Sequence, residues 1–253
     1  MRPGDLTRLF LFLFVLPLLT VALSMAANDG VILLHGLCRS SGSMKKMANA
    51  LSAAGFAVAN YGYASRTADI RSLADLAIGQ TLSSPKLQSC PRIHFVTHSL
   101  GGILVRSYFT RHPQDRLGRV VMLGPPNQGS EVVDALKAWR LFRWLNGPAG
   151  AELGTDVEST PNRLGPVDFQ LGVIAGDRSI NWISSLMIPG KDDGKVSVER
   201  TKVAGMTEHL TLHSTHPYLM KNREVIDRTV RFLKEGSFFG KTVIPSEILS
   251  RTG

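Results

Sequence analysis

Short apolar runs alternate along the chain with segments whose apolar residues recur every three or four positions. The runs that predict strands are residues 31–34, 56–61, 93–96, 119–123, 169–175 and 195–203. Helical stripes fall at Met44, Met47, Ala48 and Leu51, at Ile70, Leu73, Ala74 and Ala77, at Leu100, Ile103, Leu104 and Tyr108, and at Ile226, Thr229, Val230 and Leu233. Strands that alternate with helices predict an α/β fold with a mostly parallel central sheet and helices on both faces.

A serine stands at the turn between a predicted strand and a predicted helix. Residues 97–102 read Thr-His-Ser-Leu-Gly-Gly, directly after the strand at 93–96. A sharp turn here would strain the backbone of Ser99 and project its hydroxyl outward. Gly101 lets the helix pack closely, and the Leu100 amide lies where unpaired N–H groups favour negative charge. We therefore predict Ser99 as a nucleophile and the Leu100 amide as an oxyanion donor.

A serine nucleophile needs a base to take its proton and a third group to orient that base. Three carboxylates follow the late strands: Asp177, Asp192 and Asp193. Asp193 is our choice, because Gly194 permits a turn before the predicted strand at 195–203. Asp177, directly after the preceding strand, stays open as the alternative.

Three histidines are candidates for the base. His216 is our choice, because it precedes Pro217 and lies just upstream of the last helix. His213 is the competitor. His209 follows Glu208 and reads as part of a surface pair.

Together these motifs resemble the secreted bacterial lipases and esterases of the α/β-hydrolase superfamily, especially the branch similar to GPI inositol-deacylase and small triacylglycerol lipases. The resemblance covers roughly residues 28–235 and rests on His35-Gly36, residues 97–102, the loop Gly-Pro-Pro-Asn-Gln-Gly-Ser at 124–130, residues 193–196 and His216. It implies ester hydrolysis by Ser99, His216 and Asp193, with no cofactor and no metal. Thr97 departs from the family's usual glycine, which affects packing rather than chemistry.

The resemblance also implies roles for the loop after the first strand. Residues 31–37 read Val-Ile-Leu-Leu-His-Gly-Leu, and hydrolases of this fold take a second oxyanion donor from such a loop. We assign that donor to the Leu37 amide. His35 and His98 read as structural, hydrogen-bonding histidines.

A segment at about 130–166 is expected to form a small helical cap insertion, as often happens at this point of such a fold. It carries five large apolar residues within seven positions: Trp139, Leu141, Phe142, Trp144 and Leu145. One helical face cannot bury all five, so some should face the pocket or the solvent. An ordinary covering helix with these aromatic residues in the core is the alternative.

The N-terminal residues 1–26 have the pattern of a signal peptide. Arg2 and Arg8 precede an apolar stretch from Leu9 to Leu19, and Ser24-Met25-Ala26 offers small residues for cleavage. We expect an exported protein, periplasmic or secreted, with a hydrolase domain at 27–235 and a tail at 236–253. An uncleaved segment anchoring the protein in the inner membrane is the alternative.

Composition and charge limit the kinds of binding partner that we expect. Of 253 residues, 43% are hydrophobic, which allows a sizeable core. The formal net charge is +9 but the basic residues are scattered, so we expect no nucleic-acid partner and possible peripheral contact with anionic membranes. Cys38 follows its strand and Cys90 precedes its own, at opposite sheet ends, so we expect no disulfide.

The sequence therefore predicts an exported serine hydrolase acting on a small-molecule or lipid ester. An amidase or acyltransferase with the same triad stays open, as does a non-catalytic binding protein on this fold. Oligomeric state has no signature in the sequence.

Overall fold

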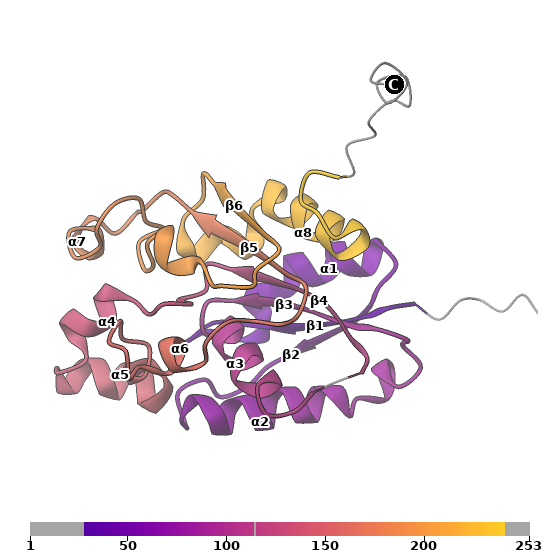
Figure 1. The fold of residues 1–253 in the computed structure, drawn as a ribbon, viewed down its shortest axis with the longest axis horizontal. Helices are drawn as coiled ribbons and strands as arrows, with labels where there is room; N and C mark the ends of the chain where they lie inside the picture. The colour runs from indigo at the N-terminus through magenta and orange to yellow at the C-terminus, as the bar shows by residue number, and fades with distance from the viewer. Residues whose placement is uncertain (1–27, 114, 241–253) are drawn as a thin grey trace, which may run out of the picture.

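A computed structural model describes residues 28–113 and 115–240 (Figure 1). Its six strands form one sheet in the order β2-β1-β3-β4-β5-β6, and every neighbouring pair is parallel. The strands are β1 (Gly30–Leu34), β2 (Ala57–Tyr61), β3 (Ile93–His98), β4 (Leu117–Leu123), β5 (Leu171–Gly176) and β6 (Glu208–Leu212). The predicted α/β architecture is confirmed.

Helices cover both faces of the sheet. The α-helices are α1 (Lys45–Ala53), α2 (Ile70–Leu82), α3 (Leu100–Phe109), α4 (Glu131–Leu136), α5 (Arg140–Ala151), α6 (Thr160–Arg163), α7 (Trp182–Ser185) and α8 (Arg223–Glu235). Short 3-10 segments are Ser41–Met44, Pro85–Leu87, Glu199–Thr201 and His216–Lys221. In Figure 1, α1 and α8 lie on one face and α2 and α3 on the other, while α4, α5 and α7 lie together at one end.

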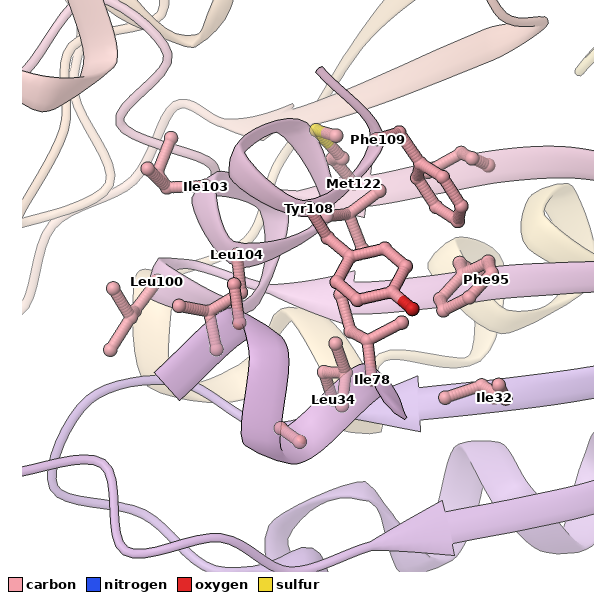
Figure 2. Close-up of a cluster of buried hydrophobic side chains, with 14 of the residues drawn as sticks. Ile32, Leu34, Ile78, Phe95, Leu100, Ile103, Leu104, Tyr108, Phe109 and Met122 are labelled. Carbon is pink, nitrogen blue, oxygen red and sulfur yellow. The ribbon is translucent and has the colours of Figure 1, made fainter. Parts of the chain in front are cut away.

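Successive residues of the buried strands enter different cores, because side chains alternate across a sheet. Ile32 and Leu34 of β1 pack with α2 and α3, as Figure 2 shows, whereas Val31 and Leu33 pack with α1 and α8. This is why β1 is apolar at every position. A strand buried on both faces needs no polar side.

The last strand differs from the sequence prediction. Residues 195–203 form a loop with the 3-10 turn Glu199–Thr201, and the sixth strand is β6. Val196 and Val203 are buried, so the apolar pattern that indicated a strand instead reflects a loop packed against the domain. The predicted strand at 195–203 is wrong for that reason.

The structure tests the predicted domain boundary near the C-terminus but not the one at residue 26. The predicted signal peptide lies outside the described residues, as does the tail from residue 241. Phe238 is fully buried against Phe232 with ring centroids 4.7 Å apart, so packed chain extends past the predicted boundary at 235. Among the described residues, no helix is both long enough and apolar enough to cross a membrane.

A buried arginine ties the segment after β4 to the main body. The Arg106 guanidinium of α3 donates to the backbone oxygens of Asn127, Pro161 and Gly165 at 2.8, 2.9 and 2.7 Å. Burial lowers the pKa of Arg106 to about 10. Because carbonyl oxygens rather than a carboxylate accept its hydrogen bonds, this side chain links α3 to the loop after β4 and to the chain in and just after α6.

Replacing Arg106 with Met should lower the free energy of unfolding by about 3 kcal/mol, since buried acceptors lose their donors. Arg92→Met, which removes an exposed ion pair to Asp29, should cost less than about 1 kcal/mol. Urea unfolding of both variants measures the difference. Equal losses would contradict the role assigned to Arg106.

Candidate active site

The turn between β3 and α3 has the strained geometry predicted for it. Ser99 has φ +52° and ψ −120°, one of two non-glycine residues with positive φ in the described part of the chain. Its amide donates to the Leu123 carbonyl at 2.9 Å. A Cβ at Gly101 would lie 2.8 Å from the Leu34 carbonyl oxygen, so only glycine fits there. Thr97 is accommodated, fully buried, in the strand before the turn.

A buried carboxylate and a histidine lie beside this turn. The Nδ1 atom of His216 is 2.7 Å from Oδ2 of Asp193, and both residues are buried. The other carboxylate oxygen accepts the Lys195 and Val196 amides at 3.0 and 2.9 Å. The Asp193 carbonyl accepts the His216 amide at 2.9 Å. These bonds fix the orientation of the carboxylate. Because Nδ1 of His216 faces Asp193, Nε2 is the imidazole nitrogen left to contact a substrate or the serine.

The competing residues form a separate pair. Nδ1 of His213 lies 3.0 Å from Oδ1 of Asp177, and the His213 side chain is 70% exposed. Neither residue lines the cavity that contains Ser99. His216, which is hydrogen-bonded to Asp193, lines that cavity together with Ser99, whereas His213 and Asp177 do not.

The remaining two candidates have structural contacts. Asp192 accepts the Gly194 amide at 2.7 Å and the Ser185 hydroxyl at 2.8 Å, which shapes the turn that carries Asp193. His209 lies in β6, where its Nε2 is 2.8 Å from the Thr201 hydroxyl oxygen. Burial is the main reason that the pKa of His209 is lowered. The predicted surface pair with Glu208 is therefore wrong: as neighbours on a strand, their side chains point to opposite faces.

His98 and His35 brace the site, as predicted. His98 is fully buried, and its Nε2 is 3.0 Å from the His216 carbonyl oxygen, which can only accept. Burial holds the pKa of His98 well below its ordinary value, so the ring is neutral and donates this bond. His35 stacks on Tyr63 with centroids 4.2 Å apart, and the Tyr63 hydroxyl donates to the His35 carbonyl at 2.6 Å.

Ser99 and His216 line one cavity of about 320 Å³ at the carboxyl end of the sheet. No hydrogen bond between their side chains is present among those of the described residues, a common situation in unliganded hydrolases. The apolar wall consists of Leu37, Pro126, Val132, Val133, Phe142, Leu153 and Val196. Between residues 28 and 240, position 114 aside, no three or more His, Cys, Asp or Glu side chains are grouped to hold a metal ion.

The two predicted oxyanion donors are the backbone amides of Leu37 and Leu100. Leu37 lines the cavity, and Leu100 is the first residue of α3. Neither amide donates a hydrogen bond within the described part of the chain. Both are therefore available to a ligand oxygen.

The predicted cap segment contributes to the cavity wall and to the surface. Phe142 lines the cavity, while Trp139, Leu141, Trp144 and Leu145 are 64, 62, 75 and 43% exposed. The expectation that some of these residues face the pocket or the solvent is confirmed. A second exposed apolar segment surrounds α7, with Ile180, Trp182, Ile183 and Leu186.

Several residues of the cavity had no signal in the sequence. Arg39 and Asn146 line it, from a loop and from α5, and no motif marks them. Ser130 and Lys195 also line it; they lie within the motifs at 124–130 and 193–196, but no role of their own was predicted for them. Cys38 also lines it and is exposed, whereas Cys90 is buried; both are free thiols, as predicted.

Comparison with known proteins identifies the class. Residues 31–226 match the model of the alpha/beta hydrolase family, and the chain belongs to this family. Family and fold together support a hydrolase. No curated protein matches the sequence significantly.

Solved structures with the same fold include lipases and esterases. The mature lipase BlEst2 of Bacillus licheniformis superposes with a TM-score of 0.65 at 22% identity, over 77% of this chain and 87% of that one. The metagenomic carboxyl esterase MGS0156 superposes with a TM-score of 0.59 at 18% identity, over 78% of this chain and 66% of the esterase chain. Phospholipase PlaB from Legionella pneumophila superposes with a TM-score of 0.56 at 19% identity, over 69% of this chain and 46% of the phospholipase chain.

Proposed function

We propose that this protein is an exported serine hydrolase that cleaves carboxylic esters, with a preference for lipid-like acyl chains. Ser99 is the nucleophile, His216 the general base and Asp193 the residue that orients the imidazole. The observation that carries the proposal is the buried Asp193–His216 hydrogen bond beside a strained serine in the same cavity.

The proposed reaction has two halves. His216 Nε2 takes the hydroxyl proton as Ser99 Oγ bonds to the acyl carbon, and the resulting tetrahedral oxyanion collapses with cleavage of the ester C–O bond. The proton passes from His216 to the departing alcohol. Water then attacks the acyl-enzyme, gives its proton to His216, and releases the carboxylic acid as the proton returns to Ser99.

The Leu37 and Leu100 amides would hold the oxyanion in both halves. Such donors act on charge that develops only in the transition state, and one donor is typically worth about 3–4 kcal/mol. Since backbone amides supply them, the side chains at these positions are free to serve packing.

The lipid preference rests on the cavity wall and its surroundings. The wall is mostly apolar, and exposed aromatic residues of α5 and α7 lie at the same end of the molecule (Figure 1). An exposed apolar patch of this kind marks a binding surface. Together with the net positive charge, it supports peripheral contact with anionic membranes, which agrees with export through residues 1–26.

Replacing Asp193 with Asn should lower kcat for a soluble ester by about 10³- to 10⁴-fold, because the amide favours the wrong imidazole tautomer. The matched control, Asp177→Asn, removes a carboxylate from the exposed pair with His213 and should keep kcat within about twofold of the wild type. Steady-state hydrolysis of a 4-nitrophenyl ester measures both. The reverse order of effects would transfer the triad to Asp177 and His213.

Replacing Phe142, an apolar residue of the cavity wall, with Ala should lower kcat/KM for long-chain esters roughly fivefold, the effect of about 1 kcal/mol of lost apolar contact. Short-chain esters should be hydrolysed as by the wild type. Val157→Ala, a change at an exposed apolar position that does not line this cavity, is the control. Equal losses for both chain lengths, with a lower Tm, would show that Phe142 is part of the core.

A further inference from the structure

The active-site cavity adjoins a second, polar cavity. The two share Cys38 and Arg39, so the loop after β1 forms their common wall. The second cavity measures about 690 Å³ and is also lined by Tyr63, Ala64, Ser65, Arg66, Thr67 and Trp144. Ser65 fixes the shared wall, because its hydroxyl accepts the Cys38 amide at 3.0 Å. An ester held at Ser99 could thus extend from one cavity into the other.

Positive charge gathers along this path. Arg39 and Arg66 line the second cavity, Arg39 and Lys195 line the first, and no carboxylate from residues 28–113 or 115–240 lines either. Neither arginine forms an ion pair with another residue of the described chain. Two guanidinium groups that line one cavity repel each other, and an anion between them would be attracted by both.

The two arginines differ in how they are held. Arg66 donates from Nη1 to the Leu145 carbonyl at 3.3 Å, which ties it to α5. The Arg39 side chain makes no hydrogen bond within the described residues and lines both cavities. Its charge also contributes, after burial, to the lowered pKa of His98 behind the nucleophile. Arg39 therefore lines the same cavity as Ser99, and its guanidinium N–H groups are free to donate to a ligand.

We propose that the second cavity binds a phosphate group on the alcohol side of the ester, held by Arg39 and Arg66, so that the enzyme prefers acyl esters of phosphorylated alcohols. The inference rests on the proposed function. The apolar cavity takes the acyl chain, and the alcohol portion then extends toward the arginines. A guanidinium presents paired N–H donors that match two phosphate oxygens, and such charge-assisted bonds are stronger than neutral ones.

The test compares two substrates that differ by one phosphate: 1-octanoylglycerol and 1-octanoylglycerol 3-phosphate, both below micelle-forming concentrations. The wild type should hydrolyse the phosphorylated ester with a kcat/KM at least roughly tenfold higher. In Arg39→Gln/Arg66→Gln this ratio should fall to about one, mainly through KM. Arg143→Gln removes an exposed charge on α5 that lines neither cavity, and it should retain the wild-type ratio.

A wild-type ratio near one overturns the proposal, as does a ratio that survives the double substitution or falls equally in Arg143→Gln. Binding of octyl phosphate to Ser99→Ala, measured by calorimetry, separates this inference from the proposed function. If neither ester is hydrolysed, the proposed function fails. The subsite then stands if octyl phosphate binds and the two arginine substitutions abolish that binding, and it falls if octyl phosphate does not bind.

Discussion

A methyl group at position 101 would lie 2.8 Å from the carbonyl oxygen of Leu34 and 3.1 Å from that of His35, so α3 can approach β1 only with glycine there. The same closeness recurs at Gly36, where a Cβ would lie 2.7 Å from Nδ1 of His98. These two contacts press the loop after β1 against the turn at Ser99. The strained serine and the unpaired Leu37 amide meet in one cavity because of this packing, and the unpaired Leu100 amide directly follows that serine in the chain.

The turn that carries the serine was predictable from the sequence, because the residue types that form such a turn are adjacent in the chain. Ser99, Leu100 and Gly101 were identified from one hexapeptide. The choice between two Asp–His pairs was not local. Asp193 with His216 and Asp177 with His213 both form hydrogen bonds, at 2.7 and 3.0 Å, and only the packing of the loops decides that His216, and not His213, lines the cavity with Ser99.

The prediction failed where burial of a loop imitated a strand. Val196 and Val203 are buried although residues 195–203 form a loop, whereas the true sixth strand, Glu208–Leu212, is mostly half-buried at the sheet edge. Arg39 and Arg66 were likewise invisible, since two isolated basic residues in loops have no pattern. Only the folded chain brings them to one cavity, beside a nucleophile more than thirty positions away from either.

The central claim is that Ser99 is chemically activated by its surroundings, and labelling with a fluorophosphonate tests it most directly. Such a probe forms a stable bond only with a serine whose hydroxyl proton is taken up as it attacks phosphorus. The account predicts one label per folded chain, located at Ser99 by peptide mass spectrometry, and none in Ser99→Ala. Folded wild-type protein that takes up no label, or a Ser99→Ala variant that is labelled equally, would contradict it.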